Sequence, residues 1–362
     1  MKQAAAIQRA SQQARNAMHE IDAQGVRDLL LIYEQAAQEV RSRLNHIADA
    51  GNKVPMHQLQ LLLRQIDGVI DTLGDQRDQL LRTAIDQAAA LGVRPFTALG
   101  VLAVGGSEAV IDSAAAMRIH EQAVRFVMEF TQADGLTLSD RLWRLDRGAK
   151  EALSRAIGQA VVQGQSAAQA AQQFLMRGEA VPADVAARVA RGQVPALGSA
   201  VDLLTNPSTG GYAQAERVMR TEINRAHGEA FMAAGEGTPG FAGWRYLLNP
   251  RHPAPDICDL LSTQNLHGLG AGVYPSREAT PWPAHPNTLS FVEMVFVDEV
   301  NDADRAGKET SLQALQRLAP EIRAGALGQT KAAYFDAGLL RTGMIRAPLY
   351  AVEQRLQRQG QL

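Results

Sequence analysis

The feature that most constrains the fold is a helical repeat of apolar side chains through the first part of the chain. One apolar stripe covers residues 26–47, and a second stripe with the same spacing covers 59–81. Because this spacing places side chains on one face of a helix, each stripe predicts an amphipathic helix with a buried face. Gly51, Asn52 and Pro55 interrupt the pattern between the stripes. We therefore expect two long helices joined by a short break, an αα-hairpin.

Helical spacing continues beyond this pair. The pattern predicts a further helix within residues 107–130. After the next turn, Thr137 or Ser139 stands directly before an apolar run, where a side-chain oxygen can cap a helix. We expect that helix to end at Gly164, because glycine weakens helix interiors, and the next one to begin at Ser166.

The second half of the chain changes character. A helix is predicted over 213–234, and two aromatic and β-branched runs of strand length follow near 243–248 and 291–297. We expect these two strands to pair antiparallel across the long proline-rich loop between them, with Trp244 in the core. Helical spacing returns after residue 301. The predicted fold class is therefore α+β and predominantly α-helical, with a helical N-terminal half and a small domain that contains the strand pair.

The pattern divides the chain into four regions. Residues 1–130 form a helical region with the long αα-hairpin, and 131–206 form a helical linker region. Residues 207–300 form the domain with the strand pair, and 301–362 form a helical C-terminal tail.

Composition excludes several classes of protein. The chain has 362 residues, with 36 Lys and Arg against 38 Asp and Glu, so its formal net charge is −2. A protein that coats duplex DNA would be strongly basic, because its affinity comes from neutralising phosphates. The one cysteine, Cys258, excludes an intrachain disulfide. The longest apolar run, 95–106, is shorter than the roughly 20 residues that cross a bilayer, so we expect a turn there and no membrane partner.

The long loop carries residue types that bind metals. They are His252, Asp256, Cys258, His267 and His285. Zinc sites in sequences usually contain closely paired ligands such as C-x-x-C, and this sequence has no such pair. We therefore predict no metal and no cofactor, with these five residues as the weak candidates, and expect hydrogen bonds and proline stiffness to hold the loop.

An enzyme is the competing interpretation of the same loop. Cys258, His285 and Asn287 occur in the chain order of a Cys–His–Asn hydrolase. A catalytic cysteine needs an adjacent imidazole that lowers its pKa. Here both groups lie on one irregular loop, so we interpret Cys258 as a small buried hydrophobic residue. A cysteine-dependent hydrolase or transferase built on Cys258 and His285 stays open as the alternative.

A polar stripe marks the helix predicted over 213–234. Its members are Arg220, Thr221, Glu222, Asn224 and Arg225. Clusters of this kind usually form charge-assisted hydrogen bonds to neighbouring loops, so we predict a structural role and no catalytic residue. Arg220 and Glu222 are two positions apart and point to different faces, so we expect Arg220 to donate to loop carbonyls.

The order of these pieces is that of a known family. The pieces are Arg220-Thr221-Glu222, Asn224-Arg225-Ala226, Trp244, Asp256-Ile257-Cys258 and His285-Pro286-Asn287. Residues 217–298 thereby resemble the C-terminal module of the Mu F-like phage minor head proteins, also called head morphogenesis proteins. The segments 138–143 and 164–166 resemble this family as well.

The departures from the family pattern narrow what the resemblance implies. Many members have further cysteines where this chain has Leu261, Thr288 and Ser290. The residues that this chain shares with the family are those of the scaffold of the fold. Without the further cysteines, the resemblance does not imply a metal or thiol cluster in this loop.

The resemblance implies a structural minor head protein of a tailed bacteriophage, acting in head morphogenesis near the portal or the capsid interior and in genome delivery. The implied partners are the portal, the major capsid protein or both, with oligomers only inside the virion and assembly in the host cytoplasm. The mildly basic C-terminal residues suggest a weak contact with packaged DNA; they are Arg341, Arg346, Arg355 and Arg358 against Glu353. A helical scaffold protein that does not stay in the virion is a further alternative.

Overall fold

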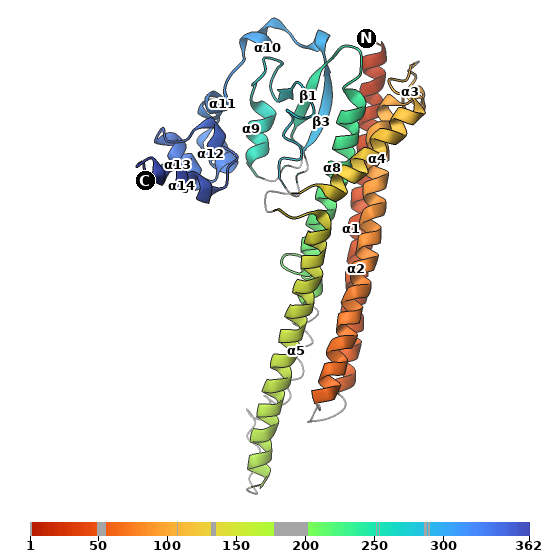
Figure 1. The fold of residues 1–362 in the computed structure, drawn as a ribbon, viewed down its shortest axis with the longest axis vertical. Coiled ribbons are helices and arrows are strands. Elements are labelled where there is room, and N and C mark those ends of the chain that lie inside the picture. Colours follow the sequence, from red (N-terminus) through yellow and green to blue (C-terminus); the bar gives the residue numbers. More distant parts are fainter. Residues whose placement is uncertain are drawn as a thin grey trace. The chain divides into compact units, whose positions relative to one another are not determined.

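The computed structural model describes residues 2–48, 56–106, 108–131, 135–176, 202–250, 252, 254–285, 288 and 290–362. The fold is α+β and predominantly helical, as the sequence predicts. Long helices occupy the N-terminal half, and a small antiparallel sheet and short helices follow (Figure 1).

The long helices bury the predicted apolar stripes. They are α1 (Lys2–Ala48), α2 (Met56–Val93), α4 (Ser113–Glu129) and α5 (Leu138–Met176). In α1 the side chains of Leu29, Tyr33 and Val40 are almost fully buried. Burial raises the pKa of the Tyr33 hydroxyl on α1, and the positive charge of Arg77 on α2 partly offsets that rise. The break predicted at Gly51, Asn52 and Pro55 lies outside the described residues.

The start of α5 follows the prediction and its end does not. The hydroxyl of Thr137 accepts from the backbone N–H of Asp140, whose carboxylate accepts from the backbone N–H of Thr137. This reciprocal pair caps the helix at Thr137. The end predicted at Gly164 is wrong, because α5 continues through Gly164 and Ser166. A single interior glycine costs only about 1 kcal/mol relative to alanine, which a long helix can absorb.

The apolar run at 95–106 forms a tight turn. It contains the 3₁₀ turn η1 (Arg94–Phe96) and the short helix α3 (Ala98–Leu102). Phe96 and Val101 are fully buried, whereas the side chain of Leu99 is 81% exposed. Among the described helices, none combines the length and the hydropathy that a membrane crossing requires.

The predicted strand pair is confirmed. Helix α8 (Gly211–Gly235) precedes β1 (Phe241–Leu247), which pairs antiparallel with β3 (Phe291–Phe296). A two-residue strand, β2 (Val273–Tyr274), adds to the other edge of β1 and gives the order β2-β1-β3. Strand β2 was not predicted, because so short a segment carries no readable alternation.

Trp244 lies in the core, as predicted. Its side chain is fully buried, and its ring lies 5.2 Å from that of Phe231 on α8. Gly235 allows this approach, since a Cβ there would lie 2.5 Å from the Trp244 ring and 2.6 Å from Met294. Figure 1 shows β1 and β3 beside α8. A smaller apolar cluster contains Val273, Val295 and Val300.

The C-terminal residues form a helical cluster. Its elements are η2 (Val297–Glu299), α10 (Asp302–Ala306), α11 (Ser311–Arg317), α12 (Pro320–Leu327), α13 (Gln329–Asp336), η3 (Thr342–Met344) and α14 (Leu349–Arg358). The elements from α11 to α14 share one core with Leu260 of the short helix α9 (Ile257–Thr263), whereas η2 and α10 contribute no buried residue to it. Helix α12 packs closely on the loop, because a Cβ at Gly325 would lie 2.3 Å from the carbonyl oxygen of Pro255.

The chain forms two compact units, each assembled from separated stretches of sequence. The sheet unit comprises Met1–His19, Asp86–Arg125 and Thr221–Leu362. The long-helix unit comprises Glu20–Ile85 and Phe126–Arg220. The four regions drawn from the sequence stay a prediction.

Candidate functional site

The polar stripe of α8 supplies the first part of the site. The side-chain amide of Asn224 donates to the carbonyl oxygens of Thr288 and Ser290, at 3.0 and 3.4 Å. Glu222 and Arg225 form an ion pair at 2.9 Å, with side chains 0% and 5% exposed. Thr221 is buried beside them. Asn224 therefore fixes the backbone that leads into β3. A structural role for the whole stripe stays a prediction.

Arg220 has different partners from those predicted. Its guanidinium lies 3.1 Å from the carboxylate of Glu216 and 3.9 Å from that of Asp22 on α1. Burial raises the pKa of Asp22, although the positive charge of Arg220 acts in the opposite direction. The bonds to loop carbonyls come from Asn224, one helical turn further along α8, so the predicted contact was assigned to the wrong residue.

The start of α9 orients Asp256. One carboxylate oxygen, Oδ1, accepts from the backbone N–H of Cys258 at 2.6 Å. Asp259 reciprocates by accepting from the backbone N–H of Asp256 at 2.8 Å, which completes a capping box. The other oxygen of Asp256, Oδ2, remains directed toward His285, which lies 2.9 Å away. Because the cap holds Oδ1, the carboxylate cannot rotate freely.

His285 contacts both Asp256 and Cys258 at the start of α9. Its Nε2 lies 2.9 Å from Asp256 Oδ2 and 3.1 Å from the sulfur of Cys258. Cys258 is fully buried, whereas the side chains of Asp256 and His285 are each 33% exposed. The hydroxyl of Tyr246 donates to the same sulfur at 3.1 Å. A buried thiol, an imidazole and a carboxylate thus converge from separate parts of the loop.

These contacts shift two pKa values. Burial would raise the pKa of Asp256, but hydrogen bonds from His285 and Cys258 outweigh it and hold the pKa at about 2. Burial, reinforced by the neighbouring Cys258, raises the pKa of Tyr246. Asp256 is therefore a carboxylate and Tyr246 a neutral donor at neutral pH.

The other histidines of the loop lie apart from this convergence. His252 Nε2 contacts Asp259 at 3.0 Å and Asp256 at 3.7 Å, so it borders the group. The ring of His267 lies edge-on to Tyr274 at 5.8 Å, and burial lowers its pKa. Of the five weak metal candidates, Asp256, Cys258 and His285 therefore come together, His252 is adjacent, and His267 lies elsewhere.

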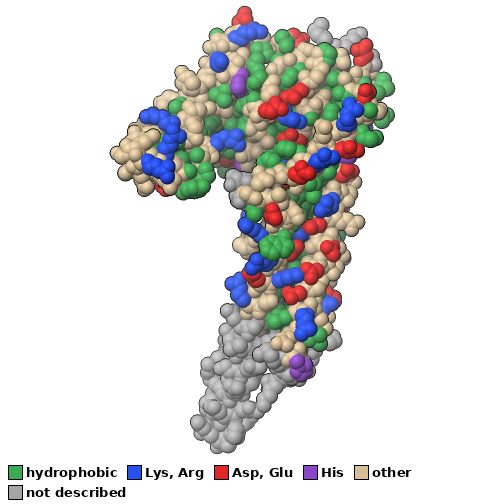
Figure 2. All heavy atoms as spheres, in the orientation of Figure 1, with side chains coloured by type: hydrophobic (Ala, Val, Ile, Leu, Met, Phe, Trp, Pro, Cys, Tyr) green, Lys and Arg blue, Asp and Glu red, His purple; other side chains and the backbone are tan. Residues whose placement is uncertain are grey.

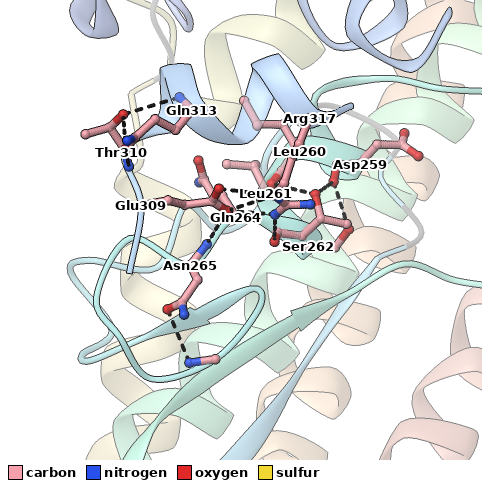
Figure 3. Close-up of polar contacts among 12 residues, drawn as sticks. Asp259, Leu260, Leu261, Ser262, Gln264, Asn265, Glu309, Thr310, Gln313 and Arg317 are labelled. Atoms are coloured by element: carbon pink, nitrogen blue, oxygen red, sulfur yellow. Dashed lines mark hydrogen bonds and ion pairs between the residues drawn. The ribbon is translucent and has the colours of Figure 1, made fainter. Parts of the chain in front are cut away.

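Helix α9 is anchored at its other end by a polar network (Figure 3). Arg317 of α11 donates to the carbonyl of Thr263 and pairs with Glu309 at 2.7 Å. Glu309 and Asn265 exchange backbone and side-chain hydrogen bonds. The loop between β1 and β3 is therefore ordered over much of its length and contains α9 and β2, which the sequence did not predict.

The geometry differs from that of a nucleophilic triad. In such a triad the nucleophile contacts one imidazole nitrogen and the carboxylate orients the ring through the other. Here Asp256 and Cys258 both face Nε2 of His285. Asn287, the third residue of the hydrolase pattern, and Pro286 lie outside the described residues.

A second polar cluster lies against α8. Within the described part of the chain, His227 Nε2 and Trp282 Nε1 are buried without a hydrogen-bond partner. Both residues line a cavity of about 10 Å³, which is at the lower limit for holding one water molecule. Arg15 of α1 lines the same cavity and pairs with Glu293 at 2.9 Å. Burial, with help from Arg15 and His19, lowers the pKa of His227 to about 3.

Sequence reasoning missed several residues of these sites. Tyr246 carried a signal, because it lies two positions after Trp244 and strand alternation places both on one face. Asp259 also carried one, as the partner of Asp256 in a capping box. Thr288, Trp282 and His227 carried none, since their roles depend on contacts with residues far away in the sequence.

Comparison of the chain with models of protein families, with curated proteins and with solved structures finds no match. The resemblance to the Mu F-like proteins therefore rests on the residues of the shared pattern alone.

Proposed function

We propose that this chain is a structural minor head protein of a tailed bacteriophage, resident in the virion and acting in head morphogenesis near the portal or the capsid interior. On this proposal it does not act as an enzyme. Its partners are the portal and the major capsid protein, and it contributes to genome delivery.

The observation that carries this proposal is the convergence of the shared pattern on one buried scaffold. Asn224 holds the carbonyls that precede β3, Trp244 fills the core, and Cys258 is enclosed between Tyr246 and His285. These polar atoms contact one another and hold the loop in place. A role of this kind in the fold fits a protein that acts by assembling with others.

The charge distribution supports the same role. In Figure 2 acidic and basic side chains are interspersed along the long helices, and basic side chains gather over the C-terminal helices. Four exposed arginines lie at this end: Arg341, Arg346, Arg355 and Arg358. Because the net charge is only −2, a contact with packaged DNA through these residues would be weak and local.

The test is the composition of phage particles. DNA-filled heads purified from a producing host should contain the chain, and the chain should co-purify with the portal when the two are co-expressed. A nonsense mutation in its gene should give defective heads. If the chain is required for assembly but absent from mature heads, it is a scaffold protein and the virion role is wrong.

The enzyme alternative is favoured by one observation, the 3.1 Å contact between Cys258 and His285. It predicts that iodoacetamide labels Cys258 rapidly and that Cys258→Ser abolishes infectivity in particles that contain folded variant. The structural proposal predicts slow labelling, because the thiol is fully buried, and infectious particles. Labelling and infectivity together decide between the two.

A further inference from the structure

We propose that Asp256, Cys258 and His285 bind a divalent zinc ion that fixes the loop between β1 and β3. The carboxylate oxygen, thiol sulfur and imidazole nitrogen of these residues all lie within 4.8 Å of one another. The first two residues belong to the start of α9, and His285 lies 27 positions beyond Cys258. This inference is independent of the virion role, since a chain without zinc can still be a head protein.

Hydrogen bonding and metal binding predict different states of these three groups. Without a metal, His285 Nε2 and the Cys258 thiol can each give a hydrogen to Asp256, whose Oδ2 lies 2.9 Å from Nε2. Nε2 also lies 3.1 Å from the sulfur. A zinc ion would replace these shared hydrogens, because it accepts a lone pair from the carboxylate oxygen, the sulfur and the imidazole nitrogen.

The surroundings suit a bound thiolate. Tyr246 donates its hydroxyl hydrogen to the sulfur at 3.1 Å, and the Thr288 hydroxyl lies 3.6 Å from it. Donors of this kind stabilise a sulfur anion, which is the form that binds metals. The helix cap occupies Oδ1 of Asp256 and leaves Oδ2 for the ion. Ligands held by outer hydrogen bonds are typical of metal sites.

The ligand types select zinc. Thiolate, imidazole and carboxylate together suit Zn²⁺, whereas Mg²⁺ and Ca²⁺ prefer oxygen ligands only. In a tetrahedral zinc site neighbouring ligand atoms are about 3.3–3.6 Å apart, so the present contacts need to widen by roughly half an ångström. The described residues supply three of the four ligands that zinc usually takes. Asp256 and His285 are partly exposed, so the ion can enter.

The test uses the full-length chain without an affinity tag, stripped with EDTA, loaded with zinc and freed of excess metal. Elemental analysis should find about one zinc per chain. Cys258→Ser and His285→Gln should lose the ion. Asp256→Asn should bind at least about tenfold more weakly while keeping the helix cap, because asparagine caps as well as aspartate. His267→Gln, outside the cluster, should bind like the wild type.

A second measurement guards against variants that fail to fold. Cobalt added to the stripped wild-type chain should give the near-ultraviolet charge-transfer band of a thiolate–cobalt bond, and zinc should abolish that band. Zinc should also raise the melting temperature of the wild type but not of Cys258→Ser. The proposal is overturned if the wild type takes up no zinc, if the cobalt band is absent, or if folded Cys258→Ser and His285→Gln retain the metal.

Discussion

Different kinds of interaction stabilise the interior of the long-helix unit and the interior of the sheet unit. In the long-helix unit, buried apolar residues such as Leu29, Val40 and Ile66 repeat along continuous helices. The exception is Arg77, which is 1% exposed and pairs with Asp146 of α5 at 2.6 Å. The absence of a side chain at Gly74 makes room for that carboxylate, since a Cβ there would lie 2.8 Å from it.

The sheet unit also has apolar clusters, but its long loop depends on single contacts between residues far apart in the sequence. Asn224 fixes the chain before β3, Asp256 caps α9, and Glu309 fastens the turn after α9. Each contact holds a stretch of backbone that has no periodic pattern of its own. A long helix can therefore lose one contact and stay helical, whereas we expect the loop between β1 and β3 to loosen where a contact is lost.

The largest effect is expected from Trp244→Ala, which removes a fully buried ring from the sheet unit. The free energy of unfolding should fall by about 3–5 kcal/mol. Hydrogen exchange should show lost protection in β1 and β3, with protection kept at Glu20–Ile85. Trp143→Ala is the matched control, because that side chain is 57% exposed. Wild-type protection in Trp244→Ala would contradict the burial.

Arg77→Ala should destabilise the long-helix unit and leave the sheet unit unchanged. Removing one partner of a buried pair leaves the other charge poorly compensated, at a cost of about 3 kcal/mol, the lower end of the range because Asp146 keeps some solvent. Hydrogen exchange should increase in α2 and α5 and stay unchanged in β1 and β3. Arg64→Ala, an exposed arginine on the same helix, should change little. Equal loss in both units would show that they unfold as one.

His227 should make the sheet unit sensitive to acid. Its pKa is about 3 in the folded chain against 6.5 for a free histidine, so the unfolded chain binds a proton first. Stability therefore falls as the pH drops below 6.5, by about 2 kcal/mol at pH 5 from this one group. Arg15 and His19 are the charged groups that face it and oppose its protonation.

The measurement is urea unfolding between pH 7 and pH 5 for the wild type and for His227→Gln. The free energy of unfolding should fall more steeply toward low pH in the wild type than in His227→Gln, if His227 takes up its proton only on unfolding. His57→Gln, an exposed histidine on α2, should follow the wild-type slope. A His227→Gln slope equal to that of the wild type would exclude this linkage.

The contrast between the units explains how much of the fold the sequence predicted. The second half of α1, the helices α2 and α8, and the pair of β1 with β3 were predicted, because periodicity is a local property of the chain. The first half of α1, from Lys2, was not predicted as a helix. Gly164 was read as a helix end because a local rule was applied where neighbouring residues override it. Strand β2 and helix α9 are short segments fixed by capping and by distant partners, which local patterns do not contain.

The candidate site was predictable in its residue types but not in its geometry. Asp256, Cys258 and His285 were all named, yet their convergence depends on the path of the residues between Cys258 and His285. The error over Arg220 has the same origin. Arg220 and Asn224 lie one turn apart on one helix face, so the pattern identified the face but not which of the two turns meets the loop.

The smallest effect is expected from Asn224→Ala, and comparing it with Arg220→Ala tests which turn of α8 holds the loop. Asn224→Ala removes two neutral hydrogen bonds to the carbonyls of Thr288 and Ser290 and should cost about 1–2 kcal/mol, because those carbonyls are buried with the amide. Limited proteolysis should then cut first within 249–290, since the backbone before β3 loses its attachment. Arg220→Ala is the matched control, because its partners are Glu216 and Asp22, and it should leave cleavage of the loop unchanged. If Arg220→Ala opens the loop and Asn224→Ala does not, the attachment belongs to the turn that the sequence first suggested, and the structural assignment of the stripe is wrong.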